Sequence, residues 1–546
     1  MRKLGAGIAG GLLAGALVGA VEALVAWLSR AGGAALPPIG WAVLVYGLVG
    51  AAAGLGAGVV ALVLRTGAFG LALASVTGGL GWMLLARAVS SPPPAATTVT
   101  GTPPANAPHV LLIVIDTLRA DHLSSYGYGA IETPHMDALA ADGTRYAHMF
   151  AQASWTRPSI ATILTGLYPS SHGAMHKADL LPERVETVAE VLARSGYHTA
   201  GFPNNINVSP AFGFAQGFAE YHYLAPDLFF YADEAAAELT LYSGLRLVRE
   251  RFFARYVNVH FYYRPAEYVV ERTRAWLDGP SAKRGPFFLY LHFMDPHDPY
   301  MVHPFNGVGY ARVAMPNPKA ELADTLLKTY DGEIAYLDEH IGALVADLKR
   351  RGLYDDMLIV VTADHGEEFH EHGGWWHGTT LYDEQIGVPL IVKPPRGGAR
   401  GRVVDELVTS LDVAPTILRS VGVPPPVAMQ GHVLPLDTAP APARDSVYAE
   451  EDFEGNVLQA VRTRTWKLIS ANAGNPRGLA PEELYDLARD SAETKNLAAE
   501  RPTEREEMRA ALGRATIKAK EHAGSGAQTD VDSATKERLK ALGYAE

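Results

Sequence analysis

Residues 110–116 read VLLIVID, an unbroken aliphatic run that ends on a carboxylate. A run of β-branched and aliphatic residues without alternation predicts a strand buried on both faces, as in a parallel sheet covered by helices. Such sheets place their chemistry at the carboxyl ends of the strands. We therefore expect Asp116, the residue that ends this run, to lie at a functional site.

From residue 109 onward, predicted strands alternate with predicted helices. The further strands are expected at residues 198–202, 286–291 and 357–362, and helices at residues 186–195 and 326–351. Apolar runs bounded by amphipathic helices, with polar residues at the strand ends, are typical of a doubly wound sheet. The sequence thus predicts an α/β fold with a mostly parallel sheet and a site along one edge.

Composition sets the outer limits. The chain has 546 residues, 48% of them hydrophobic, which predicts a large domain with additions. A formal net charge of −12 gives no general reason to expect nucleic acid as a partner. Cysteine is absent, so an active site built on a cysteine-derived group is excluded.

The first 90 residues predict three transmembrane helices. Residues 4–28, 38–64 and 68–85 are nearly charge-free and about as long as a helix that crosses a ~30 Å hydrocarbon core. A signal peptide is the alternative for the first run, but three consecutive runs and the lack of a clear cleavage site speak against it. Residues 91–108, rich in Pro, Ala and Thr, are predicted to be a linker.

The cations flanking these runs give the expected orientation. Arg2, Lys3 and Arg65 lie on one side and Arg30 and Arg87 on the other, a slight excess that favours a cytoplasmic N-terminus. Three spans would then place everything after Arg87 outside the cytoplasm. We expect a multi-pass protein of the cytoplasmic membrane whose catalytic domain is extracytoplasmic.

Carboxylate and imidazole groups recur at the ends of the predicted strands and in the Gly-rich loops beyond them. Taken singly, such an Asp is more often a helix cap and such a His a packed side chain. Together they have the donor types that Zn²⁺ or a similar divalent ion takes. The residues concerned are Asp116, His292, Asp295, His297, Asp364, His365 and His377.

Ordered motifs resemble the sulfatase family of the alkaline phosphatase superfamily. They are DTLRADHL at 116–123, YGY at 126–128, TPHMD at 133–137, LTGLYP at 164–169, DHGEE at 364–368 and VPLIV at 388–392. The resemblance implies an alkaline-phosphatase-like catalytic domain over residues 109–435. KLI at 467–469 and ELYDL at 483–487 are similar to that family's small C-terminal α+β subdomain, expected over residues 436–500, and residues 501–546 are expected to form a helical tail.

Four positions depart from the pattern of true sulfatases. In the Cys/Ser-x-Pro-x-Arg motif, whose first residue becomes formylglycine, this chain has Thr156 and, in place of the Arg, Ile160. Thr117 stands where many sulfatases have a metal-binding acid, and His377 where they commonly carry a sulfate-binding Lys. Threonine cannot become formylglycine, so the sulfatase chemistry is in question.

The same positions resemble the threonine-nucleophile branch, which includes nucleotide pyrophosphatase/phosphodiesterases and membrane-anchored phosphoethanolamine and phosphoglycerol transferases. This resemblance implies that Thr156 is the nucleophile and binds a metal together with Asp116, Asp364 and His365. It also implies that His297 and His377 serve a second metal or the phosphoryl oxygens. A metal lowers the pKa of an alcohol and neutralises the ester, which a threonine nucleophile requires.

Five further residues are candidates for substrate contacts or for hydrogen-bonding support of the site. His292 precedes His297 as the first of a histidine pair, Asp295 is a rival ligand to His297, and Trp376 either covers the substrate or packs a subdomain interface. The full set is His292, Asp295, Arg119, Asn204 and Trp376.

These patterns predict a membrane-anchored, metal-dependent hydrolase or transferase that acts on phosphate-type esters. One or two Zn²⁺ ions are the expected cofactor, with Ca²⁺, Mg²⁺ or Mn²⁺ as alternatives. The expected partners are the lipid bilayer, through residues 4–90, and an envelope glycan, lipid or small ester as substrate. A sulfuric ester hydrolase and a non-catalytic envelope binding protein are the alternative functions.

Overall fold

The computed structural model describes residues 98–226 and 262–544, apart from 397, 524, 525, 530, 532 and 543. The three predicted membrane spans lie outside these residues. Among the residues described, no helix combines the length and the apolar character that crossing a bilayer requires. The chain divides into two compact units, and the fold and the site belong to the unit formed by Pro94–Ala225, Val257–Asp530 and Leu539–Glu546.

An eight-stranded sheet is the centre of this unit, with strand order β13-β2-β12-β9-β1-β6-β4-β5. Only β12 runs against its neighbours β2 and β9, and the other pairs of the sheet are parallel. The predicted α/β class with a mostly parallel sheet is confirmed. The strands are β1 (Val110–Ile115), β2 (Thr144–Phe150), β4 (His198–Phe202), β5 (Glu220–Tyr221), β6 (Phe287–Phe293), β9 (Leu358–Ala363), β12 (Gly387–Lys393) and β13 (Arg402–Thr409).

Strand β1 is buried along its whole length, as its unbroken aliphatic run predicts. It pairs in parallel with β6 on one side and β9 on the other, and Ile115 lies opposite both Phe293 and Ala363. This register puts Asp116 beside Asp364, the residue that follows β9. The pairing therefore brings together two acids that are far apart in the sequence.

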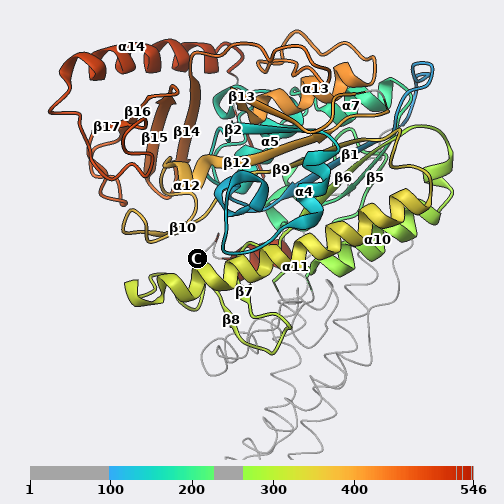
Figure 1. Ribbon diagram of the computed structural model, residues 1–546, viewed down its shortest axis with the longest axis horizontal. Helices are drawn as coiled ribbons and strands as arrows, with labels where there is room; N and C mark the ends of the chain where they lie inside the picture. Colours follow the sequence, from blue (N-terminus) through green and yellow to red (C-terminus); the bar gives the residue numbers. More distant parts are fainter. Residues whose placement is uncertain are drawn as a thin grey trace, which may run out of the picture. The chain divides into compact units, whose positions relative to one another are not determined.

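Helices cover both faces of the sheet (Figure 1). One face carries α4 (Pro134–Ala141), α10 (Ala266–Asp278) and α11 (Ala323–Arg350), and the other carries α5 (Thr156–Thr165), α7 (Val188–Arg194) and α13 (Val413–Ser420). The long helix α11 buries apolar residues spaced three or four apart, which gives it one apolar face for the sheet. These residues are Leu326, Tyr330, Ile334, Leu337, Ile341, Leu344 and Leu348.

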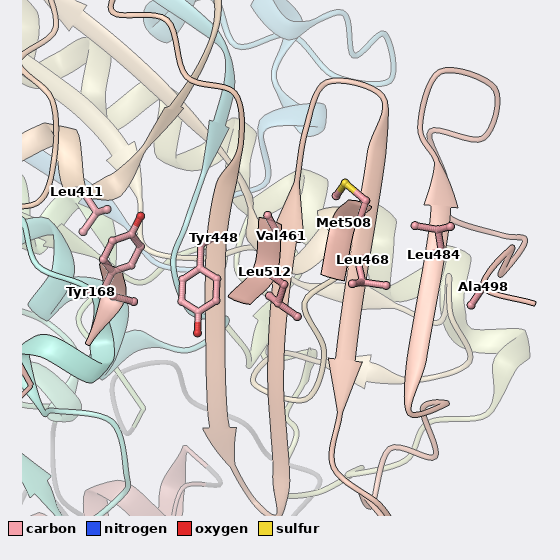
Figure 2. Packing of buried hydrophobic residues seen from close by; sticks show 10 residues of the cluster. Tyr168, Leu411, Tyr448, Val461, Leu468, Leu484, Ala498, Met508 and Leu512 are labelled. Atoms are coloured by element: carbon pink, nitrogen blue, oxygen red, sulfur yellow. The ribbon is translucent and has the colours of Figure 1, made fainter. Parts of the chain in front are cut away.

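A second, antiparallel sheet follows in the chain, with strand order β14-β15-β16-β17. Helix α14 (Pro502–Ala519) packs on one face of it, and Met508 and Leu512 meet Val461, Leu468 and Leu484 in one apolar cluster (Figure 2). Burying this apolar face accounts for the position of the helix. The strands are β14 (Val447–Phe453), β15 (Asn456–Arg462), β16 (Trp466–Ala471) and β17 (Glu482–Asp486).

Shorter elements complete the unit. Strand β18 (Ala527–Gln528) pairs with β3 (Asp179–Leu180), β7 (Tyr300–Met301) with β8 (Gly309–Tyr310), and β10 (Glu368–Phe369) with β11 (Trp375–Trp376). The short helices are α6 (Pro169–His172) and α12 (Asp383–Ile386). Helix α15 (Ser533–Ala541) has its residues up to Arg538 in the other unit and its end in this one. Single 3₁₀ turns are η1 (Ala120–His122), η2 (Ser124–Tyr126), η3 (Ile206–Val208), η4 (Pro210–Phe212), η7 (Ser281–Lys283), η8 (Ala320–Leu322) and η9 (Ser410–Asp412).

A buried ion pair network joins the second sheet to the main body. The ammonium of Lys467, on β16, has a fully buried side chain and lies 2.8 Å from a carboxylate oxygen of Asp383 and 2.8 Å from one of Glu493. Asp383 is the first residue of α12, which directly precedes strand β12 of the main sheet. The amine neutralises two acids that would otherwise repel each other.

We predict that Lys467→Met lowers the free energy of unfolding by about 3–5 kcal/mol, because it leaves the buried carboxylate of Glu493 without its cation, while Asp383 keeps its pair with Arg462. Chemical denaturation of the purified protein measures this change. The matched control is Lys495→Met, since Lys495 forms an exposed pair with Glu500 at 2.8 Å and its loss should cost about 0–1 kcal/mol. Equal effects of the two substitutions would contradict the assigned role of Lys467.

Candidate active site

Three ligand-type side chains meet at the carboxyl ends of β1 and β9. Asp116, Asp364 and His365 are fully buried and offer ligand atoms that all lie within 4.8 Å of one another. The Nε2 atom of His365 is 3.5 Å from Oδ1 of Asp116 and 3.5 Å from Oδ2 of Asp364. This is the edge of the sheet at which the sequence predicted the site.

Each carboxylate has one oxygen held by the protein and one left over. Asp116 Oδ2 accepts a hydrogen bond from the Asn205 amide at 2.7 Å, and Asp364 Oδ1 accepts from the backbone N–H groups of Thr117 and His365. Asp116 Oδ1 and Asp364 Oδ2 are buried and have no hydrogen-bond partner. The two unpartnered oxygens are those nearest to His365 Nε2. A buried, unpaired carboxylate oxygen is costly, and a cation at this point would satisfy both.

The backbone at Thr117 helps to build this arrangement. Thr117 has φ 58°, in the left-handed region that a β-branched residue rarely occupies. The turn directs its N–H toward Asp364 at 3.2 Å. Strain of this kind, worth about 1–3 kcal/mol, is held only where the surrounding structure enforces it, as at functional sites.

The charges at the cluster also favour a cation. Burial, together with repulsion from Asp364, raises the pKa of Asp116 to about 6, and burial raises the pKa of Asp364 to about 7. Burial lowers the pKa of His365 to about 4, so its imidazole is neutral near pH 7, which is the form that binds metals. Two carboxylates and a neutral imidazole fit a divalent ion, and when bound it would bring both carboxylates back to their charged form.

Thr156 lies beside this cluster. It is the first residue of α5, it is fully buried, and its Oγ1 is 3.4 Å from His365 Nε2. The Asn205 amide reaches both Thr156 Oγ1, at 3.4 Å, and Asp116 Oδ2, at 2.7 Å. The structure therefore brings Thr156 together with Asp116, Asp364 and His365, the four residues expected to share one metal.

The three predicted histidines lie next to the cluster. His292 Nε2 is 3.6 Å from Asp116 Oδ2, and neither ring nitrogen of His292 has a hydrogen-bond partner. The ring of His377 lies 4.5 Å from that of His365 and 5.0 Å from that of His297, between centroids. His377 Nδ1 is 3.0 Å from a carboxylate oxygen of Glu367. His297 and His377 thus form a second group of imidazoles beside Thr156.

Three predicted candidates lie elsewhere. Asp295 Oδ1 accepts a hydrogen bond from the N–H of Ala266, the first residue of α10, and Asp295 does not belong to the group of ligand atoms formed by Asp116, Asp364 and His365. Asn204 is bonded through its side chain to the backbone of Arg264. Trp376 donates to the carbonyl of Pro316 and stacks on Tyr300, which corresponds to packing rather than to covering the metal cluster.

Arg119 has a supporting position, as expected from the sequence. Its guanidinium donates to Asp121, to the carbonyl of Glu367 and to Glu371. It therefore ties the loop after β1 to the loop after β9. Among the described residues, Arg119 forms no hydrogen bond or ion pair with Asp116, Asp364 or His365.

Sequence reasoning missed three contributors to the site. Asn205 follows β4 directly after Asn204, and only the exact path of the chain beyond the strand decides which amide points inward. Glu367 lies inside the DHGEE motif and was not assigned a role. Tyr544, whose hydroxyl is 3.2 Å from His297 Nε2 and 2.9 Å from His377 Nε2, belongs to no motif and comes from a remote part of the chain.

The mixed α/β sheet, with buried carboxylates and imidazoles at the strand ends and a hydroxyl beside them, defines a class of alkaline-phosphatase-like, metal-dependent enzymes that act on ester bonds. The chain belongs to the sulfatase family: the family model described as Sulfatase matches residues 108–423. A second model, described as N-sulphoglucosamine sulphohydrolase, C-terminal, matches residues 370–521. The family typically uses a divalent metal, and Asp116, Asp364 and His365 form a cluster that could hold one.

Curated relatives include sulfatases and a multifunctional protein of the alkaline phosphatase superfamily. The arylsulfatase of Clostridium perfringens is 25% identical over 443 residues, covering 71% of this chain and 90% of the relative. Human arylsulfatase A is 28% identical over 451 residues, covering 72% and 84%. A multifunctional alkaline phosphatase superfamily protein of Trinickia caryophylli is 26% identical over 420 residues, covering 63% and 80%.

Solved structures share the fold. The phosphonate monoester hydrolase of Agrobacterium radiobacter superposes with a TM-score of 0.59 at 22% identity, covering 78% of this chain and 100% of that one. A protein solved in complex with its substrate D-glucosamine-2-N,6-O-disulfate gives a TM-score of 0.59 at 21% identity, covering 76% and 98%. At these identities the likeness concerns the architecture alone.

We predict that the purified protein binds a divalent metal and that Asp364→Asn weakens this binding at least tenfold. The change removes one of two negative charges while its Oδ1 can still accept the two backbone hydrogen bonds. Metal titration followed by thermal melting measures the effect. In the presence of a chelator, Asp364→Asn should melt no lower than the wild type, because one of two repelling carboxylates is gone.

Asp295→Asn is the matched control for this experiment. Asp295 is equally buried, its pKa is raised well above the ordinary value by burial, and it caps α10 outside the cluster. Its amide variant should bind metal like the wild type. Loss of metal binding in Asp295→Asn with retention in Asp364→Asn would assign the ion to another place.

Proposed function

We propose that this sulfatase-family protein is a membrane-anchored, metal-dependent hydrolase or transferase of phosphate-type esters that uses Thr156 as its nucleophile. The observation that carries this proposal is the position of the Thr156 hydroxyl, 3.4 Å from His365 and beside the two unpartnered carboxylate oxygens. A hydroxyl placed at a metal cluster is in position for nucleophilic attack on an ester bound there.

The surroundings of Thr156 do not fit the chemistry of formylglycine. Ile160 is fully buried and has no charged group to offer where the sulfatase motif has its arginine. The neighbouring Arg157 does not replace it, because its guanidinium donates to the carbonyls of His176, Lys177 and Asp179 and to the Asn207 side chain. The guanidinium of Arg157 therefore binds the segments packed beside α5.

A reaction through Thr156 follows from the positions of these groups. The Oγ of Thr156 forms a bond to phosphorus, the bond from phosphorus to the alcohol oxygen of the ester breaks, and the proton lost by Thr156 leaves with the alcohol. Water or an acceptor hydroxyl then displaces Thr156 and restores its hydroxyl. A bound divalent ion would lower the pKa of the Thr156 hydroxyl and neutralise the ester oxygens.

The chain's own residues contribute orientation and charge. Asn205 donates toward Oγ1 of Thr156 and toward Asp116, so it fixes the nucleophile relative to the cluster. Thr156 begins α5, whose N-terminal end favours an anionic group. Full burial of the nucleophile and the ligands excludes bulk water, which strengthens these interactions.

A sulfuric ester hydrolase is the second candidate. It is favoured by the names of several relatives, including the arylsulfatases of Clostridium perfringens and human. The names of the multifunctional alkaline phosphatase superfamily protein and of the phosphonate monoester hydrolase do not describe a sulfatase. The ester linkage is therefore best decided with a panel of phosphomonoesters, phosphodiesters, phosphonate monoesters and sulfate esters on the purified protein.

We predict that Thr156→Ala lowers turnover of phosphate esters by about 10³-fold or more, because the nucleophile is removed. Thr156→Ser should keep part of the activity, since the alcohol survives. Thr156→Cys should not gain sulfatase activity in a host that makes formylglycine, because Ile160 replaces the arginine of the motif. Steady-state kinetics measures the first two variants, and mass spectrometry of trapped enzyme should find phosphate on the peptide that contains Thr156.

Ser154→Ala is the matched control. Ser154 is a buried hydroxyl close to Thr156 in the sequence, but its N–H and Oγ both bond to Glu451 rather than to the cluster. Its variant should keep wild-type turnover. Wild-type turnover in Thr156→Ala would refute the mechanism. The same holds if Ser154→Ala loses turnover while Thr156→Ala keeps it.

The membrane anchor is part of the same proposal. It is supported by the three nearly charge-free runs in residues 4–85 and by the positions of Arg2, Lys3 and Arg65. An extracytoplasmic catalytic domain would meet envelope glycans, lipids or small esters as substrates. Such a substrate would reach the enzyme without crossing the bilayer.

We predict that a reporter fused after Ser91 is active when it requires export and inactive when it requires the cytoplasm. The expectation follows from three spans and a cytoplasmic N-terminus. Paired fusions of an export-dependent and a cytoplasm-dependent reporter at the same residue measure it. The opposite pattern would place the catalytic domain in the cytoplasm.

A further inference from the structure

The hydroxyl of Tyr544 occupies the space in front of the proposed nucleophile. It lies 2.9 Å from His377 Nε2 and 3.2 Å from His297 Nε2, and it lies next to the side chain of Thr156. Three groups of the candidate active site thus converge on one oxygen atom. This oxygen belongs to an alcohol, the same functional group that an ester releases or accepts.

The hydrogen-bond roles at this oxygen match those of a substrate alcohol. His297 Nδ1 lies 2.6 Å from the carbonyl of Asp298, which can only accept, so Nδ1 carries a proton. In the neutral ring, Nε2 of His297 then accepts a hydrogen bond from the Tyr544 hydroxyl. An alcohol that arrives at, or leaves from, phosphorus needs a proton acceptor of this kind.

The ring of Tyr544 lies among aromatic side chains. Its centroid is 6.3 Å from that of Trp155, 6.4 Å from that of Phe453 and 6.1 Å from that of His377. Tyr544 is 2% exposed. The space it fills is therefore an apolar, ring-sized subsite that opens onto the nucleophile.

With Tyr544 in this place the site is closed. Thr156, His297 and His377 are each 0% exposed, as are Asp116 and Asp364. An ester cannot approach a nucleophile that has no exposed surface. Access therefore requires that some part of the chain moves, and Tyr544 is the group that stands directly against the nucleophile.

Tyr544 is held by a local hydrogen bond and by buried neighbours. Its N–H donates to the carbonyl of Leu539 at 2.8 Å, and Leu539 and Leu542 are themselves buried. Further back, β18 pairs with β3, and the N–H of Thr529 donates to the carbonyl of Ala178. Withdrawal of Tyr544 therefore requires that its hydrogen bond to Leu539 breaks and that Leu542 becomes exposed, while the pairing of β18 with β3 can stay intact.

We propose that Tyr544 is a gate, and that its side chain is an internal occupant of the subsite for the alcohol part of the ester. Substrate binds when Tyr544 withdraws and an apolar or ring-bearing alcohol group takes the place of its side chain. The proposal rests on the proposed function in that Thr156 is the nucleophile, and it names the substrate group that lies next to it.

The test compares Tyr544→Ala, Tyr544→Phe and the wild type as full-length, metal-loaded proteins. An occupant that keeps the site closed about 90% of the time or more weakens apparent binding about tenfold or more. Tyr544→Ala should therefore raise kcat/KM for an aryl phosphate about tenfold, and p-cresol should inhibit it by competing for the vacated subsite. Tyr544→Phe keeps the ring and should give a smaller gain.

Hydrogen exchange gives a readout that does not depend on turnover or on a substitution. In the wild type, saturating p-cresol should displace Tyr544 and speed exchange of the peptide that contains the Leu539 to Tyr544 turn. Tyr448→Phe is the control, because Tyr448 is a buried tyrosine whose hydroxyl contacts Glu450 far from the cluster. It should change neither the kinetics nor the response to p-cresol.

The outcomes separate this inference from the proposed function. Lower kcat/KM in both Tyr544 variants, or unchanged exchange of the turn at saturating p-cresol, would overturn the gate and leave Tyr544 as an assisting or structural residue. Binding of p-cresol to Tyr544→Ala together with turnover of sulfate esters alone would support the gate while refuting the phosphate-ester proposal.

Discussion

Two carboxylates that are buried side by side are the constraint on which this structure depends. Asp116 and Asp364 follow adjacent parallel strands whose register places Ile115 opposite Ala363, so the two acids meet at the same edge of the sheet. Burial and mutual repulsion oppose their charged forms. A cation bound between the two carboxylates would stabilise their charged forms. The other side chains of the site surround this position.

The neighbouring residues hold this unfavourable pair in place. The backbone of Thr117 adopts a left-handed conformation and donates to Asp364, while Asn205 binds the other acid. Only one oxygen of each carboxylate is taken up, and the free oxygens lie next to His365 and Thr156. The strain and the desolvation are thus concentrated at the point where chemistry is expected, as the physics of active sites leads one to anticipate.

Elements distant in the sequence complete the environment. The antiparallel sheet with α14 packs on the body through an apolar cluster and through Lys467, and its Phe453 lies against Trp155, the residue before Thr156. Tyr544 joins the same aromatic group and meets the histidines. The region that the family model for the C-terminal part matches therefore contributes Phe453 to the neighbourhood of Thr156 as well as stability.

The sequence by itself determined the α/β class, the buried strands and the residues that follow them, because hydrophobic periodicity and strand-end chemistry are local properties. Asp116, Thr156, Asp364 and His365 could be named from their motifs, and the structure places them together. It could not be read from the sequence that Asn205 rather than Asn204 points inward, that Asp295 caps α10, or that Trp376 packs on Tyr300. These choices, and the contact of the Tyr544 hydroxyl with His297 and His377, depend on contacts between segments that are 29 to 247 residues apart. Only the tertiary structure decides them, since the free energy of such contacts comes from burial and geometry that no local pattern encodes.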